Sequence, residues 1–369
     1  MGPFPHDAPP AKIDADNPAG LDGFAFVEFA HPEPAALEDL FRRMGFEPVA
    51  RHRERPVTIW RQGRVDYILN AAPDGHGGAF VAEHGPCAPS MAWFTVDPNH
   101  AKRHAVEGGA EPVEEGRTAG WPAIRGIGGS LVYFLTRPAD GPHPYEAEFE
   151  WLGARHPEPA GAGLFYIDHL THNVHRGRMD WWAEWYGRLF GFRQIRYFDI
   201  EGKLTGLHSR AMTSPCGKIR IPINESADDK SQIEEYLRDY RGEGIQHIAC
   251  GCRDIYDSVT ALKERGLAFM PPPPDTYYQK VDERLPGHGE PLDRLRENGI
   301  LIDGEAVASG SETKVLLQIF SATVIGPIFF EFIQRKGDEG FGEGNFRALF
   351  ESIEEDQIRR GVLKPEAAE

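Results

Sequence analysis

The sequence predicts an α+β protein of two domains, each built from repeated strand–helix–strand–strand–strand (βαβββ) modules whose open sheet curls around a pocket. Three observations support this prediction. The 369 residues exceed the size at which a single hydrophobic core stops growing. Similar segments recur in the same order on both sides of a stretch rich in Gly and Pro, 153–163. The first strand of each half alternates apolar and polar residues, as expected of a sheet with one face toward a cavity.

Composition divides the chain into four regions. Residues 1–20 are rich in Pro, Ala and Asp and lack an apolar stretch, so we expect a disordered leader and not a signal peptide. Residues 21–152 form the expected N-terminal domain, which binds no metal. Residues 153–163 form the linker, and residues 164–369 form the expected C-terminal catalytic domain.

The internal repeat is weak residue by residue, but it keeps its order through three pairs of segments. Both members of the last pair end in Arg. Chance similarity between amphipathic elements is the alternative explanation. The corresponding segments are 23–52 and 164–199, 90–113 and 247–270, and 129–137 and 327–335.

Charge and cysteine content limit the possible partners. A net charge of -17 argues against nucleic acid and anionic membranes, because both favour clustered Lys and Arg. The apolar runs are far too short to span a bilayer. Four cysteines are too few for a disulfide framework, and we interpret them as reduced thiols in a cytoplasmic protein.

The segment 179–190 predicts an amphipathic helix. Trp182, Trp185, Tyr186 and Leu189 recur at spacings of three and four residues and form one apolar stripe. Such a stripe is more typical of core packing than of a cofactor site.

Three residues with metal-binding side chains interrupt apolar strands of the second half. His169 lies in "FYIDHL", His247 in "GIQHIAC" and Glu331 in "IFFEFIQ". A carboxylate among Ile and Phe is costly to bury unless a cation compensates its charge. Two imidazoles and one carboxylate on one face of an octahedral ion leave three positions free, which is typical of non-haem Fe(II) oxygenases. The alternative is that the three strands carry polar residues by coincidence.

The first half provides an internal control. In the repeat, Glu28, Ser90 and Tyr133 correspond to the three candidate ligands, so the set is confined to the second half. His172 and His175 follow the first candidate ligand where the strand gives way to a loop. We interpret them as ordinary polar residues, although the spacing of three raises the question of a histidine cluster.

The second half resembles the 4-hydroxyphenylpyruvate dioxygenase family. The resemblance is carried by "YIDHLTHNVHRGRM", "IRIPINE", "GEGIQHIA", "LLQIF" and "FFEFIQRKGDEGFGEGNFRALFESIEEDQIRRGVL", and it covers residues 160–362 almost without interruption. The first half matches more loosely, through "GFAFVEFA", "GPCAPSMAW" and "GSLVYFL". The resemblance implies the vicinal-oxygen-chelate fold with a C-terminal helix over the C-terminal barrel. It also implies one Fe(II) per chain, bound by His169, His247 and Glu331.

The resemblance further implies a substrate site of polar and apolar residues. The polar contacts are Ser209, Asn224, Gln232, Gln246, Gln318 and Asn345. The remaining wall is Pro222, Phe320, Phe329, Phe341, Phe346 and Leu349. Closure of the C-terminal helix would exclude water from the site; an ordinary docking helix is the alternative.

The implied reaction converts 4-hydroxyphenylpyruvate and O₂ to homogentisate and CO₂ in tyrosine catabolism. Its nearest rival is 4-hydroxymandelate synthase, which hydroxylates the benzylic carbon of the same substrate; Pro222 and Asn224 in "IPINE" favour homogentisate. Ring-cleaving extradiol dioxygenases, a zinc hydrolase and a metal-free binding module of the same fold are further alternatives. By resemblance, we expect a homo-oligomer, either a dimer or a tetramer.

Overall fold

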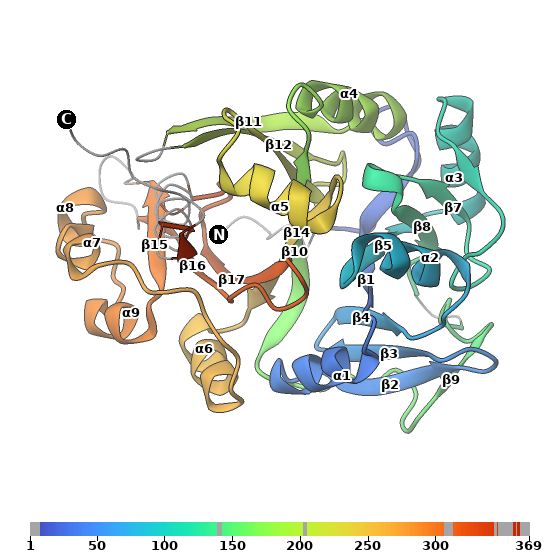
Figure 1. Ribbon diagram of the computed structural model, residues 1–369, viewed down its shortest axis with the longest axis horizontal. Helices are drawn as coiled ribbons and strands as arrows, with labels where there is room; N and C mark the ends of the chain where they lie inside the picture. Colours follow the sequence, from blue (N-terminus) through green and yellow to red (C-terminus); the bar gives the residue numbers. More distant parts are fainter. Residues whose placement is uncertain are drawn as a thin grey trace.

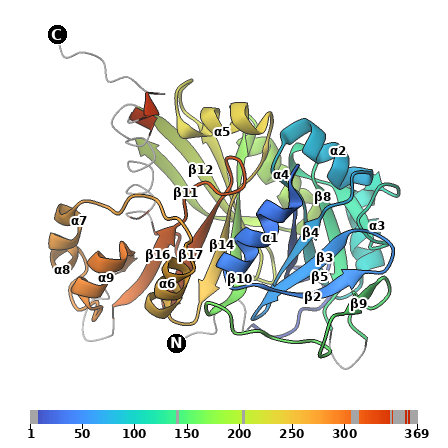
Figure 2. The same ribbon diagram turned by 60° about the horizontal axis from the view of Figure 1, so that its bottom comes forward.

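The computed structural model describes residues 8–138, 142–201, 205–305 and 313–342, together with residues 345, 357, 358, 360 and 361. Two curled sheets lie side by side, one from each half of the chain (Figures 1 and 2). The expected C-terminal helix lies largely outside the described residues, as do Phe346 and Leu349 and residues 1–7 of the expected leader.

The first half forms a nine-stranded sheet. Its strands are β1 Leu21–Ala30, β2 Glu47–His52, β3 Val57–Gln62, β4 Val65–Asn70, β5 Cys87–Thr95, β6 Pro112–Val113, β7 Ala123–Arg125, β8 Leu131–Thr136 and β9 Phe149–Trp151. They follow the order β6-β7-β8-β5-β1-β4-β3-β2-β9. The helices are α1 Pro34–Arg43, α2 Gly75–His84 and α3 Pro98–Glu107, with a 3₁₀ turn η2 at Ile127–Gly129.

The second half forms an eight-stranded sheet. Its strands are β10 Leu164–Val174, β11 Arg193–Glu201, β12 Gly206–Thr213, β13 Arg220–Ser226, β14 Gly244–Cys252, β15 Leu301–Glu305, β16 Lys314–Phe320 and β17 Phe329–Lys336. They follow the order β11-β12-β13-β10-β14-β17-β16-β15. The helices are α4 Met179–Phe190, α5 Gln232–Tyr240, α6 Ile255–Glu264, α7 Asp275–Gln279, α8 Val281–Arg284 and α9 Leu292–Asn298.

Each sheet contains two βαβββ modules, which confirms the predicted fold. In the second half the modules are β10-α4-β11-β12-β13 and β14-α6-β15-β16-β17. The first and last strands of each module pair in parallel, and the two first strands pair antiparallel at the centre of the sheet. The first half repeats this pattern around β1 and β5.

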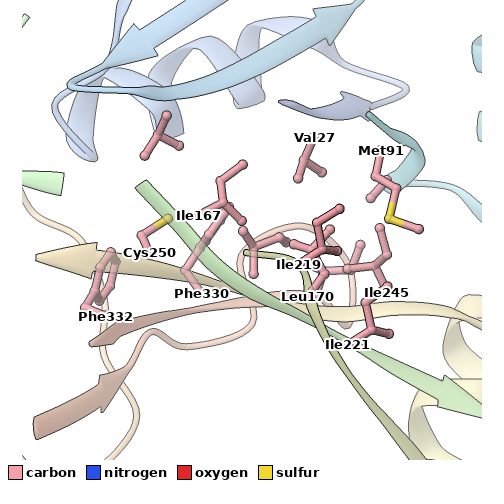
Figure 3. Packing of buried hydrophobic residues seen from close by; sticks show 14 of the residues in the cluster. Val27, Met91, Ile167, Leu170, Ile219, Ile221, Ile245, Cys250, Phe330 and Phe332 are labelled. Atoms are coloured by element: carbon pink, nitrogen blue, oxygen red, sulfur yellow. The ribbon is translucent and has the colours of Figure 1, made fainter. Parts of the chain in front are cut away.

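The outer faces of the two sheets share one hydrophobic core. Val27 and Met91 of the first half face Leu170, Ile245 and Phe330 of the second (Figure 3). Because side chains alternate along a strand, the residues between these core positions point into the two barrels. The strands that carry the candidate ligands are therefore supported from behind by the first half.

The two barrels differ in what fills them. Aromatic side chains pack together inside the first barrel, where Trp121 stacks on Phe149 with ring centroids 5.7 Å apart. Phe26 and Tyr133 belong to the same cluster. The corresponding space of the second barrel holds the polar residues described below.

Strand pairing corrects one of the correspondences between the two halves. Phe26 lies opposite Ala92 on β5, as His169 lies opposite Ala249 on β14, and each follows a β-bulge at the same place. Phe26, and not Glu28, therefore occupies the place of His169. A shift of two residues keeps every side chain on its face, so sequence alternation alone did not reveal the error.

The described part of the leader, residues 8–20, contains no helix or strand but contacts both halves. Lys218 donates to the carbonyl of Pro9 at 3.0 Å, and the ring of His100 lies 2.8 Å from the carbonyl of Pro18. Among the described residues, every helix is too short or too polar to cross a lipid bilayer.

Candidate metal centre

Three neighbouring strands position the candidate ligands. His169 lies on β10, His247 on β14 and Glu331 on β17. Ala249 lies opposite both His169 and Glu331, and His247 lies two residues earlier on the same face of β14. The three side chains therefore point to the same side of the sheet, into the barrel.

The ligand atoms converge on one point. The Nε2 atom of His169 lies 3.1 Å from Oε2 of Glu331, and Nε2 of His247 lies 3.4 Å from the same oxygen. One ligand atom from each residue falls within 4.8 Å of the others, and all three side chains are buried. Two imidazole nitrogens and a carboxylate oxygen in this arrangement fit a divalent metal ion.

The charges of the site depend on one another. Burial raises the pKa of Glu331, but His169 and His247 oppose this effect and bring the pKa to about 2. Burial lowers the pKa of His169, yet the carboxylate of Glu331 raises it above its ordinary value overall. Burial lowers the pKa of His247. The three side chains are thus electrostatically coupled, and a cation bound between them would compensate the charge of the carboxylate.

The outer nitrogens of both histidines are held by the preceding residue. Nδ1 of His169 lies 2.8 Å from Oδ1 of Asp168, and Nδ1 of His247 lies 3.1 Å from Oε1 of Gln246. Both acceptors leave Nε2 of each ring facing Glu331. Sequence reasoning assigned Gln246 to the substrate and overlooked Asp168.

Amide groups extend the site from Glu331. Gln318 donates from Nε2 to Oε1 of Glu331 at 2.7 Å. The amide of Asn345 lies 2.9 Å from that of Gln318 and 2.8 Å from the hydroxyl of Tyr277. Gly342 has a φ of +67°, and a Cβ there would lie 2.6 Å from Oε1 of Gln318, so this close approach requires glycine.

Three of the predicted aromatic residues border the ligands. Phe329 stacks on the ring of His247 with centroids 4.8 Å apart, and Phe341 meets the ring of His169 edge-on at 5.4 Å. Phe320 lies opposite Glu331 on β16 and packs against Phe329. These rings cover part of the polar site with apolar surface.

A row of buried polar groups crosses the sheet at one end of the site. Asn173 lies opposite Asn224, and Asn224 lies opposite Ser209. Asn224 donates to Oδ1 of Asn173 at 3.3 Å. Oγ of Ser209, Oδ1 of Asn224 and Nδ2 of Asn173 are buried and have no hydrogen-bond partner among the described residues. A polar ligand would satisfy them, since buried polar groups are normally hydrogen-bonded.

Sequence reasoning identified Ser209 and Asn224 but missed Asn173. Side-chain alternation along the strand could have identified Asn173. It lies four residues after His169 and two after Thr171, and so on the same face of the strand.

The other predicted residues lie close to these groups. Pro222 is buried on β13, two residues before Asn224. Gln232 begins α5 and, with Gln246 and Phe329, lines a cavity of about 600 Å³. Phe329 contacts both this cavity and His247, so the cavity adjoins the site.

His172 and His175 do not join the metal centre. His172 points under α4, where its Nδ1 lies 3.3 Å from the hydroxyl of Tyr186, and His175 is exposed. Helix α4 begins and ends where the sequence predicted, and Trp182, Trp185, Tyr186 and Leu189 are all buried.

Both halves match known families. Residues 15–150 match the family described as Hydroxyphenylpyruvate dioxygenase, HPPD, N-terminal. Residues 166–284 match the Glyoxalase/Bleomycin resistance protein/Dioxygenase superfamily.

Similar proteins cover nearly the whole chain. The chain is 55% identical over 359 residues to the 4-hydroxyphenylpyruvate dioxygenase of Pseudomonas aeruginosa, which spans 96% of this chain and 99% of that protein. It is 50% identical over 353 residues to the protein of the same name from Legionella pneumophila, with coverage of 95% and 98%. A solved fusion of a xylose isomerase-like TIM barrel with a 4-hydroxyphenylpyruvate dioxygenase superposes with a TM-score of 0.77 at 30% identity, over 94% of this chain and 53% of that one.

Proposed function

The chain belongs to the 4-hydroxyphenylpyruvate dioxygenase family, and on this premise we propose that it converts 4-hydroxyphenylpyruvate and O₂ to homogentisate and CO₂ in tyrosine catabolism. The reaction balances because both oxygen atoms of O₂ enter homogentisate while the carboxyl carbon leaves as CO₂. The observation that carries the proposal is the convergence of two imidazoles on one buried carboxylate inside the second barrel.

We propose that one Fe(II) per chain is held by His169, His247 and Glu331. Bound iron would supply the redox chemistry and the O₂ activation that side chains lack, while the net electrons would come from the substrate. Three protein ligands on one side leave the opposite positions available to substrate and O₂. Gln318 holds the second oxygen of Glu331, so Oε2 remains directed at the histidines.

The polar row and the amides orient the substrate. Ser209, Asn173 and Asn224 offer donors and acceptors that no other described residue uses. All three are neutral, so they can bind polar groups without placing a fixed charge in the pocket. Gln318, Gln232 and Asn345 form further polar contacts. Phe320, Phe329 and Phe341, with Pro222, form the apolar wall of the proposed substrate site; the sequence assigns Phe346 and Leu349 to the same wall, and both lie outside the described residues. Gln246 acts through His247, whose Nδ1 it holds.

Two described residues near the end of the chain, Gln357 and Arg360, contact α5 beside the cavity, which Glu235 and Arg360 line. Arg360 and Gln357 both donate to Glu235, at 2.7 and 2.8 Å. This attachment supports a role of the C-terminal segment as a cover over the substrate site.

The proposal is tested by loading the metal-free protein with Fe(II) without oxygen, then adding 4-hydroxyphenylpyruvate and air. We expect oxygen uptake that depends on both iron and substrate, with homogentisate identified by mass and chromatography. 4-Hydroxymandelate as the product would instead assign benzylic hydroxylation. Absence of oxygen uptake by iron-loaded protein would reject a dioxygenase.

We further propose a cytoplasmic homo-oligomer, a dimer or a tetramer, with a leader at 1–20, domains at 21–152 and 164–369, and a linker at 153–163. Trp181, Ile195 and Tyr197 are large exposed apolar side chains on α4 and β11, and β11 is an edge strand, which supports assembly there. Light scattering coupled to size-exclusion chromatography measures the mass.

A further inference from the structure

Behind His169 lies a buried ion pair between Asp168 and Arg335. Arg335 donates to Asp168 through two nitrogens, Nε at 2.7 Å and Nη2 at 2.8 Å, and both side chains are almost completely buried. The hydroxyl of Tyr166 donates to the same carboxylate at 2.9 Å. The carboxylate also lies 2.8 Å from Nδ1 of His169.

A β-bulge explains how the side chains of the adjacent residues Asp168 and His169 can contact each other. Neighbouring side chains on a regular strand point to opposite faces. The pairing of β10 with β14 shifts between Ile167 and His169, so Asp168 has no direct partner across the sheet. Bulges re-aim side chains in this way near active sites. Here the bulge brings the carboxylate to the outer nitrogen of the imidazole.

The first half has the same bulge but no carboxylate in it, so the bulge does not by itself require an Asp. Its equivalent bulge lies between Phe24 and Phe26, which places Ala25 where the second half has Asp168. The Arg at the end of the repeat remains, but Arg137 pairs with Asp22 instead. The fold therefore keeps the bulge in both halves, while Asp168 occurs only beside the candidate ligands.

Arg335 connects the ligand to the segment that follows β17. Its Nη1 donates to the carbonyls of Asp338 and Gly340. Phe341, the next residue, packs on the ring of His169. One guanidinium thus fixes both the partner of His169 and the backbone that carries Phe341.

We propose that Asp168 and Arg335 form a positioning pair for His169. Asp168 keeps the proton of the imidazole on Nδ1, so the lone pair of Nε2 faces the metal position, and Arg335 holds Asp168 and the 338–341 segment in register. Second-sphere carboxylates of this kind orient metal-bound histidines. The inference rests on the metal role proposed for His169 above.

The test compares Asp168→Asn with Asp66→Asn in full-length protein. Asp66 is a matched control in the first barrel, because Arg61 binds it through two nitrogens at 2.5 and 2.7 Å and Tyr145 donates to it at 2.8 Å. Both variants weaken a buried Arg–Asp–Tyr cluster. The readouts are the Co(II) dissociation constant, from titration against a competing chelator, and the visible spectrum of bound Co(II).

We expect Asp168→Asn to weaken Co(II) binding about 10- to 100-fold and to alter the spectrum. Asp66→Asn should lower the melting temperature. Its Co(II) affinity should stay within about twofold of that of the unmodified protein, because the Asp66 cluster contains no candidate ligand. Native-like Co(II) affinity in folded Asp168→Asn would reduce the pair to a structural role and overturn the proposal.

A double variant covers the case in which Asp168→Asn fails to fold. Asp168→Asn with Arg335→Gln removes both buried charges together and restores a neutral cluster. We expect it to fold and still to bind Co(II) weakly; restored affinity would overturn the proposal. Failure of the unmodified protein to bind Co(II) would instead reject the metal site itself, and the positioning role with it.

Discussion

At the scale of single residues, the site consists of ordinary side chains in an unusual arrangement. His169, His247 and Glu331 are buried, and one ligand atom from each lies within 4.8 Å of the others. Asn173, Asn224 and Ser209 lie in one row across the sheet, and each has a buried polar atom without a hydrogen-bond partner among the described residues. Both the ligand set and the polar row can therefore be tested by substituting one residue.

Substitution of His247 by Ala should abolish metal retention and turnover, because only one imidazole and one carboxylate would remain. Metal content after gel filtration, measured by mass spectrometry, gives the result. His172→Asn is the control, since His172 points under α4 and should leave the metal content unchanged. A His247→Ala protein that retains metal and activity would exclude this residue from the site.

Substitution of Asn224 by Ala should lower kcat/KM for 4-hydroxyphenylpyruvate by about 10- to 100-fold, which corresponds to loss of one or two buried hydrogen bonds of about 1–3 kcal/mol. Metal content should not change, because no hydrogen bond joins Asn224 to a candidate ligand among the described residues. Steady-state oxygen consumption measures the effect. An unchanged kcat/KM would show that the polar row does not contact the substrate.

At the scale of elements, helix α4 and strand β10 enclose a histidine without a compensating charge. His172 is fully buried between them, and its Nε2 has no hydrogen-bond partner in the part of the chain that the structure describes. Burial, with a smaller contribution from His247, lowers the pKa of His172 to about 3. The packing of α4 against the sheet therefore requires the neutral ring.

This burial predicts a loss of stability in acid. The unfolded chain binds a proton at His172 near its ordinary pKa of 6.5, whereas the folded chain does so only near 3, so stability falls as pH drops through this window. Between pH 7 and 5 the contribution is about 2 kcal/mol. Urea unfolding of metal-free native protein and His172→Asn at both pH values should show a smaller pH dependence in the variant. If the stability of both proteins depended equally on pH, His172 would not titrate as described.

At the scale of the whole molecule, the two sheets form one core although only one barrel carries the candidate site. Phe29 and Tyr67 of the first half pack on Phe330, which neighbours Glu331 on β17. The first half thus supports the ligand strands while aromatic residues fill its own barrel. Metal binding should consequently stabilise the molecule as a unit.

Metal addition should raise the free energy of unfolding of the metal-free protein by about 2.7 kcal/mol at a free metal concentration 100 times the dissociation constant. The reason is that the three ligands come together only in the folded state. Thermal unfolding with increasing Co(II) measures the effect, and chelator should reverse it. His247→Ala should show no such shift; an equal shift in this variant would place the stabilising metal elsewhere.

The sequence by itself determined the order of the modules, the helix at 179–190 and the three candidate ligands. These followed because polar residues within apolar strands and 3.6-residue periodicity are local properties of the chain. The twelve candidate substrate residues came from the family resemblance, and their roles stay predictions; Phe346 and Leu349 lie outside the described residues.

Only the tertiary structure decided which residues stand opposite one another across strands. Alternation repeats every two residues, so it could not distinguish Phe26 from Glu28 as the counterpart of His169. The alternation of residues also did not predict the bulge that turns Asp168 toward His169. Nor did it predict that Arg335 on β17 contacts Asp168. Register, bulges and pairing between distant strands arise from packing of the complete sheet, and these contacts set the surroundings of the candidate metal centre.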